Sequence, residues 1–151
     1  MTDCIAKRIR FWRLYQTILN EKGNPFKLYP AYETDGSPKH YAGINSFGED
    51  GRKMPVLTVV YLYREKRCRI CVYIENDLDT YNQLFAHKDE IEREVGMELV
   101  WKNGEKNKNT RWIKREIQFY QNDEAEWREE IEKSLPFVEK FIAAVKPYVY
   151  C

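Results

Sequence analysis

The stretch from Asn76 to Phe119, NDLDTYNQLFAHKDEIEREVGMELVWKNGEKNKNTRWIKREIQF, decides the fold of this chain. Its first half predicts an amphipathic helix, because apolar residues recur there at helical spacing. These residues are Tyr81, Leu84, Phe85, Ile91 and Val95. Asp77 or Asp79 can cap the start of the helix, and Gly96 is the residue type that favours a left-handed conformation at its end.

The second half predicts two strands. Glu98–Trp101 and Arg111–Tyr120 have the composition of strands, and the basic hairpin loop 102–110 joins them. We expect Trp101, at the end of the first of these strands, to lie in the core.

Outside this stretch, hydrophobic spacing and turn residues predict the other elements. A first helix is expected at Asp3–Glu21, and a loop rich in proline and glycine at 24–39. Three strands are expected at His40–Phe47, Met54–Tyr63 and Arg67–Glu75. A last helix carries an apolar stripe over 127–145, and Pro136 should kink it or split it in two, with Ser134 as a second cap.

The expected order of elements is therefore α-β-β-β-α-β-β-α, in a single domain over residues 1–151. The short connections between strands favour antiparallel pairing. The sequence predicts an α+β fold with a mainly antiparallel five-stranded sheet and helices packed on one face.

Composition indicates a globular protein. The 151 residues are 43% hydrophobic, 15% aromatic and 32% charged, which excludes a disordered or fibrous chain. The formal net charge of +1 does not indicate a binder of polyanions, so any such function depends on local charge. The sequence contains no signal-peptide pattern and no apolar run near the roughly 20 residues of a membrane span. We expect a cytoplasmic protein that has no membrane partner.

Cys68 and Cys71 form a CxxC, a spacing that is found in zinc sites. These two cysteines lie in a predicted strand, however, where residues three apart point to opposite faces. We therefore expect two unrelated small hydrophobic side chains, no metal ligands and no cofactor.

The segment 84–96, LFAHKDEIEREVG, followed by ELVW at 98–101, resembles the prokaryotic domain-of-unknown-function family 4268. Further matches in the order of that family are Phe11-Trp12, Arg69–Ile74, Lys88, Ile91-Glu92, Gly96, Trp101, Arg111 and Trp127. The resemblance covers about 8–149. It implies a setting of DNA restriction or defence beside nuclease-like modules, and it brings no established activity. The family often has Glu before Leu-Tyr-Ile, where this chain has Cys71 before Val-Tyr-Ile.

Enzyme templates are poorly matched. The sequence has no GxSxG, no phosphate-binding glycine loop and no HExxH. A nuclease of the PD-(D/E)xK kind needs an acid on one strand and Glu/Asp-x-Lys on the next, to hold Mg²⁺ and assist the attacking water. Glu75-Asn76-Asp77 offers acids but no lysine at the required place. We predict no catalytic residues.

A binding surface is predicted around the basic loop, where cations lie beside flat rings that suit phosphates and exposed bases. The candidate nucleic-acid-binding residues are Lys102, Lys106, Lys108, Arg111, Trp112, Lys114 and Arg115. The same pattern also fits a solvated hairpin tip whose rings pack on the core. Trp112 is therefore the most informative of these residues.

Two other charged segments support a different hypothesis. The first helix is basic, and the last helix starts with an acidic run over 123–132. Opposed charged surfaces suit docking to another protein, although a basic helix face is also simply solvated.

We expect a non-enzymatic binding module, associated with DNA or RNA in a bacterial or archaeal restriction or defence setting. The alternative is an interaction or regulatory module for a separate protein effector, and the third hypothesis is a degenerate or active nuclease. The sequence leaves the oligomeric state open.

Overall fold

The computed structural model describes residues 3–24, 28–29, 41–44, 56–62, 67–104, 109–118 and 124–149. The helices of this part of the chain are α1 Asp3–Glu21, α2 Leu78–Ala86, α3 Lys88–Val95 and α4 Glu124–Val145, followed by the short 3₁₀ helix η2 Lys146–Tyr148. The strands are β1 Leu28–Tyr29, β2 Tyr41–Ile44, β3 Val56–Leu62, β4 Arg67–Glu75, β5 Val100–Asn103 and β6 Thr110–Gln118.

The strands form one sheet in the order β1-β2-β3-β4-β6-β5, and each pairing is antiparallel. After β4 the chain passes through α2 and α3 and enters the sheet again at its edge as β5. It then turns back so that β6 lies between β5 and β4. The long strands β4 and β6, which are separated in sequence by two helices, are therefore neighbours at the centre of the site described below.

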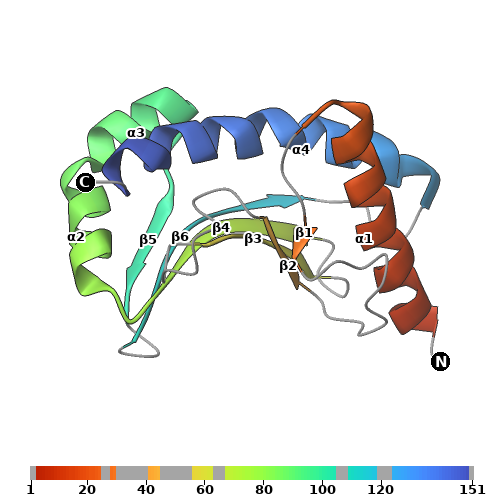
Figure 1. Ribbon diagram of the computed structural model, residues 1–151, viewed down its shortest axis with the longest axis horizontal. Coiled ribbons are helices and arrows are strands. Elements are labelled where there is room, and N and C mark those ends of the chain that lie inside the picture. The colour runs from red at the N-terminus through yellow and green to blue at the C-terminus, as the bar shows by residue number, and fades with distance from the viewer. Residues whose placement is uncertain are drawn as a thin grey trace.

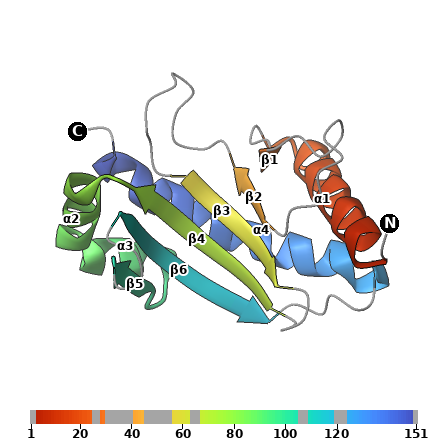
Figure 2. The ribbon, with the colours of Figure 1, turned by 90° about the horizontal axis from the view of Figure 1, so that it is seen from below.

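Among the described helices, α4 covers one face of this sheet, while α1 and α2 flank its two ends. In Figure 1, α4 crosses above the strands, with α1 at one end and α2 and α3 at the other. Figure 2 shows the opposite side, where the strands lie in front of α4 and α1 and α2 stand at either side of them. Among the described residues, the sheet thus has one face covered by helices and one face that carries none, which we call the open face.

The core lies between the sheet and the helices, and alternate residues of the strands direct their side chains into it. Cys68, Ile70, Val72 and Ile74 of β4 belong to the buried cluster. Aromatic rings from α1 and α4 complete it: the rings of Phe11 and Trp127 meet edge to face with centroids 5.4 Å apart. Such rings bury about 150–250 Å² each, so they account for much of the stability of this layer.

The ends of α2 and α3 follow from local chemistry. The carboxylate of Asp77 caps α2 by accepting hydrogen bonds from the backbone N–H (3.0 Å) and the hydroxyl (2.6 Å) of Thr80, which confirms one of the two predicted caps. Gly96 ends α3 with φ 89°, as predicted. A side chain with a Cβ rarely adopts this left-handed conformation.

The α+β class is confirmed, but the predicted five-stranded sheet and the predicted order of elements are wrong. In the described part of the chain the sheet has six strands, because the two-residue strand β1 lies within the segment 24–39 that was expected to be a loop. Only 24 and 28–29 of that segment are among the described residues. A pairing of two residues depends on the neighbouring strand β2, so no local pattern indicates it.

The helix expected before Gly96 is two helices, because the chain leaves helical geometry at His87 (φ −110°, ψ 23°). The His87 ring stacks on that of Tyr148 in η2, with centroids 4.1 Å apart. This change of direction lets α3 pack on α4 while α2 contacts η2. A contact between residues that are distant in sequence thus lies at the break, and no local pattern indicated it.

Of the two effects predicted for Pro136, a kink or a split, the split is wrong, because α4 runs without interruption through Pro136. The hydroxyl of Ser134 donates a hydrogen bond to the carbonyl of Ile131 (2.8 Å), so Ser134 does not cap a second helix. Packing of the buried face of α4 compensates for the hydrogen bond that proline cannot make.

Candidate functional site

The residues predicted to bind nucleic acid do not form one surface. Alternation along β6 places Trp112 and Lys114 on the open face and Arg111 and Arg115 on the face toward the helices. The guanidinium of Arg115 lies over the ring of Phe137 in α4, 5.0 Å from its centroid. The Nε of Arg111 donates to Oδ1 of Asn103 at 2.7 Å.

The other predicted residues come from the hairpin of β5 and β6. Lys102 is exposed, and its register partner on β6 is Trp112. Lys106 and Lys108 lie outside the described residues. The structure thus brings together Lys102, Trp112 and Lys114 and separates them from Arg111 and Arg115.

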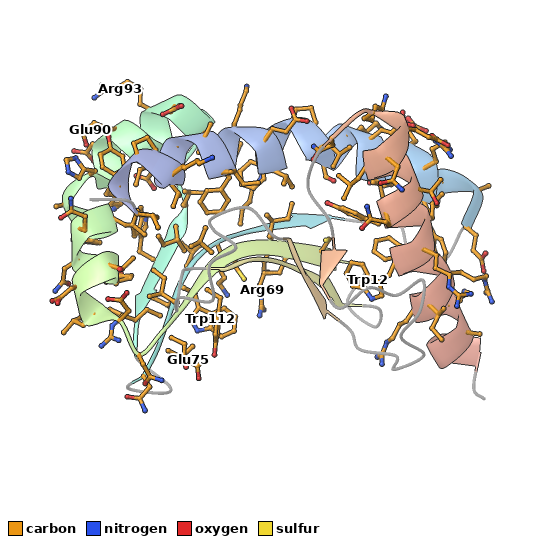
Figure 3. All side chains as sticks on the ribbon, viewed as in Figure 1. Trp12, Arg69, Glu75, Glu90, Arg93 and Trp112 are labelled. Atoms are coloured by element: carbon orange, nitrogen blue, oxygen red, sulfur yellow. The ribbon has the colours of Figure 1, made fainter. Side chains whose placement is uncertain are left out.

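Trp112 is the centre of a small cluster on the open face. Its ring meets that of Tyr73 on β4 edge to face, with centroids 5.9 Å apart and planes at 74°. Two cations lie near the same ring: the guanidinium carbon of Arg69 is 5.4 Å and the Nζ of Lys114 is 5.8 Å from its centroid. Figure 3 shows Arg69 and Trp112 projecting from the sheet on the side away from α4. Half-buried Trp112 is thus a surface ring with cations beside it.

Trp101 has a different environment, although it comes from the same hairpin. Its ring packs edge to face against the rings of Tyr81 and Phe85 in α2, at 6.2 and 5.6 Å. Trp101 is partly buried and packs against the main core cluster, so it belongs to the helix side of the sheet.

One carboxylate lies between the two cations of the open face. Oε1 of Glu116 is 3.0 Å from the Nη2 of Arg69 and 3.6 Å from the Nζ of Lys114. The side chains of Arg69 and Lys114 keep 21% and 18% of their surface exposed. Both side chains are therefore only partly exposed, and a carboxylate lies between their cationic groups.

The thiol of Cys71 lies beneath these cations. Burial raises its pKa to about 12, against the lowering effect of the nearby Arg69 and Lys114. The thiol is therefore protonated at neutral pH and does not act as a nucleophile. Cys68 lies in the core on the other face, where burial raises its pKa to about 12 as well. The expected divergence of the CxxC side chains is confirmed.

Arg69, Tyr73 and Glu116 belong to the cluster but were not among the predicted site residues. Alternation along 67–75 assigns Arg69 and Tyr73 to one strand face, which was an available signal. The pairing of β4 with β6 was not, because two helices and β5 separate these strands in sequence.

The basic and acidic helices that suggested protein docking pair with each other. The guanidinium of Arg10 in α1 donates a bidentate pair of hydrogen bonds to the carboxylate of Glu124 in α4, from Nη2 to Oε1 at 2.5 Å and from Nε to Oε2 at 3.2 Å. A second contact joins Arg128 of α4 to Glu21 of α1 at 2.7 Å. These exposed charges therefore join α1 to α4 within the chain.

The acids considered for a nuclease have unequal surroundings. Both carboxylate oxygens of Asp77 are engaged by Thr80 in the helix cap. Glu75 is exposed at the end of β4, as Figure 3 shows. Within the described ranges, no group of three or more His, Cys, Asp or Glu side chains could hold a metal ion.

A family model described as a domain of unknown function (DUF4268) matches residues 8–149. The chain belongs to the DUF4268 family. Comparison with curated proteins and with solved structures gave no match. In the described part of this DUF4268 chain, no helix is both long and apolar enough to cross a membrane.

Several residues that carried the resemblance stabilise the fold of this DUF4268 domain. Oε2 of Glu92 in α3 accepts hydrogen bonds from the backbone N–H of Leu99 at 2.6 Å and the indole N–H of Trp101 at 3.4 Å. Glu92 thereby fixes the turn at Gly96 and the start of β5. The glutamate, glycine and tryptophan of this segment thus have a structural role, separate from the cluster around Trp112.

Proposed function

We propose that this DUF4268 domain is a non-enzymatic module that binds nucleic acid through the open face of its sheet. The observation that carries the proposal is the half-buried ring of Trp112 with the cationic groups of Arg69 and Lys114 within 6 Å of its centroid. Cations neutralise phosphates, and an aromatic ring offers a surface on which bases stack. A cytoplasmic location and a restriction or defence setting, as predicted, belong to the same proposal.

The geometry supports a choice of candidate binding residues from one side of the sheet. Arg111 and Arg115, which the sequence grouped with Lys114, have partners on the helix side in Asn103 and Phe137. Lys102 adds an exposed cation to the open face, where it lies opposite Trp112 in the pairing of β5 with β6. We therefore assign binding to alternate residues of β6 rather than to the whole basic segment.

Glu116 makes the proposal sharper, because it opposes binding. Its carboxylate is within 4 Å of both Arg69 and Lys114, where a phosphate would experience repulsion. Removal of this charge should strengthen the attraction of the same two cations for a polyanion.

Binding of short fluorescent DNA and RNA strands at about 50 and 200 mM salt tests the proposal, because phosphate contacts make affinity fall with salt. We expect Lys114→Gln to weaken binding and to make its salt dependence shallower by about 0.7 in the log–log slope. Glu116→Gln should instead tighten binding.

Arg111→Gln is the matched control, because it removes one positive charge three residues from Lys114 on the other face of the same strand. After correction for net charge, the affinity of the Arg111→Gln variant for the nucleic-acid strands should equal that of the unmodified chain. Absence of binding to both nucleic acids at 50 mM salt would overturn the proposal. Equal losses for Lys114→Gln and Arg111→Gln would overturn the assignment to the open face.

The alternative, a module that docks a protein effector, has one observation in its favour. Leu78 and Phe85 of α2 keep 45% and 49% of their surface exposed, and a partner could cover these two apolar side chains of one helix. Phe85→Ser should leave nucleic-acid affinity unchanged if the open face binds. A loss of affinity in that variant would move the binding surface to α2.

A further inference from the structure

The open face has an ordered pattern of charge and rings across three strands. The register pairs Arg69 with Glu116, Cys71 with Lys114, and Tyr73 with Trp112 between β4 and β6. Successive rows on one face are about 6.7 Å apart, and neighbouring strands about 4.8 Å apart. The ring pair therefore lies one row beyond Lys114 and two rows beyond Arg69.

The cations of this face follow a diagonal. Arg69 lies on β4, Lys114 on β6 one row further, and Lys102 on β5 one row further again, opposite Trp112. Each step advances by one strand and one row. Phosphates that followed this diagonal would pass along the side of the Tyr73 and Trp112 rings.

The diagonal leads away from the acid at the end of β4. Glu75 is one row beyond Tyr73 on the same strand, opposite Thr110. A polyanion that crossed toward β5 would leave Glu75 at its side, whereas one that followed β4 would meet it. The diagonal therefore avoids Glu75, although it passes Glu116 between its first two cations, which is why Glu116→Gln should tighten binding.

The two rings are arranged so that one can accept a base. In an edge-to-face pair, one ring directs its edge at the other, so the pair does not cover all of its own faces. The cationic groups of Arg69 and Lys114 also lie over the Trp112 ring, so a base would stack on the part of this ring that these side chains leave uncovered. Bases within a duplex are stacked on each other and cannot lie on a protein ring, whereas single strands offer unstacked bases.

We infer that the open face binds single-stranded nucleic acid, with its phosphates along the Arg69–Lys114–Lys102 diagonal and one base stacked on Trp112. This inference rests on the proposed function and names its ligand class. If the inference is correct, the affinity depends on the bases of the ligand as well as on its phosphates. The dependence on the bases must come from the ring of Trp112.

A comparison of three ligands on the unmodified chain tests the inference. They are a labelled oligothymidylate, an abasic strand with the same number of phosphates, and a duplex of the same length. We expect the abasic strand and the duplex to bind about 5- to 150-fold more weakly than the oligothymidylate, which is the range for stacking of a base on an aromatic ring.

Variants at Trp112 connect this difference to the ring. The Trp112→Leu variant should bind the oligothymidylate only as tightly as the unmodified chain binds the abasic strand. Its affinity for the abasic strand should stay unchanged. Trp112→Phe keeps a ring and should retain part of the difference, and it serves as the second variant if leucine disturbs folding. Circular dichroism checks that both variants are folded.

The outcomes separate the inference from the proposed function. Equal, salt-dependent binding of all three ligands would overturn the inference and leave the proposed function intact. A preference for the duplex would do the same. Absence of binding to any of the three at about 50 mM salt would overturn both.

Discussion

The two faces of β6 differ in what they contact, although their residues alternate along nine positions of one strand. On the helix side, Ile113 is fully buried in the core, and Arg115 lies over Phe137. On the open side, Trp112 and Lys114 are half-buried among Arg69, Tyr73 and Glu116. A basic segment of sequence therefore does not necessarily form one basic surface, because successive side chains of a strand point to opposite faces of the sheet.

The same comparison applies to the tryptophans. Trp127 is 1% exposed and packs against Phe11, whereas Trp112 is half-buried on the open face. One ring stabilises the core, and the other is available to a ligand. Substitution of Trp127 should therefore lower stability, whereas substitution of Trp112 should mainly lower the affinity for the ligand.

The largest expected effect is on stability in Trp127→Ala. Removal of a buried tryptophan should lower the free energy of unfolding by about 3–5 kcal/mol, because it loses burial and leaves a cavity. Trp112→Ala should cost about 1 kcal/mol or less, the scale of a cross-strand pair. Urea unfolding followed by circular dichroism measures both. Equal losses would mean that the open face is part of the core.

A smaller effect is expected at the turn between α3 and β5. Glu92→Ala leaves the N–H groups of Leu99 and Trp101 without their acceptor, so the free energy of unfolding should fall by about 2 kcal/mol. Glu94→Ala, an exposed change on the same helix, should stay within about 0.5 kcal/mol. Both are measured by urea unfolding. If Glu92→Ala were no worse than Glu94→Ala, the turn would not depend on these hydrogen bonds.

The smallest expected effect comes from the charges that join α1 and α4. The hydrogen bond from Arg128 lowers the pKa of Glu21, and the hydrogen bond from Arg10 lowers the pKa of Glu124. A carboxylate with a lowered folded pKa stabilises the fold above its unfolded pKa of about 4.3, and this contribution is lost as pH falls through the folded pKa.

The melting temperature should therefore fall slightly as pH decreases from about 5 to 3, and less so in the double variant with Arg10→Gln and Arg128→Gln. These groups are exposed, so the effect should weaken as salt is added. An identical decrease in the double variant would show that the pairs contribute nothing.

The sequence predicted the elements whose signals are local. The helix–glycine–strand segment up to Trp101 follows from apolar spacing, a capping aspartate and the left-handed glycine, and both caps are confirmed. The break at His87, the strand β1 and the continuity of α4 through Pro136 were missed. Each of these depends on partners distant in sequence, such as Tyr148 for His87.

The candidate site was predictable only in part for the same reason. Lys102, Trp112 and Lys114 follow from composition near the hairpin. Arg69 and Glu116 join them only because β4 and β6 pair across two helices. Alternation along β6 separates Arg111 and Arg115 from the cluster, and the predicted strand Arg111–Tyr120 already carried this signal.

The most direct test of the open face uses the four tryptophan indole N–H signals in a nitrogen–proton correlation spectrum of the labelled chain. Trp12 and Trp127 lie in the core, Trp101 lies between α2 and the sheet, and Trp112 lies on the open face. On addition of oligothymidylate at about 50 mM salt, we predict that the Trp112 signal, assigned with Trp112→Phe, shifts far more than the other three. A ligand-induced shift at Trp101 with none at Trp112, or no shift at any of the four, would contradict the account.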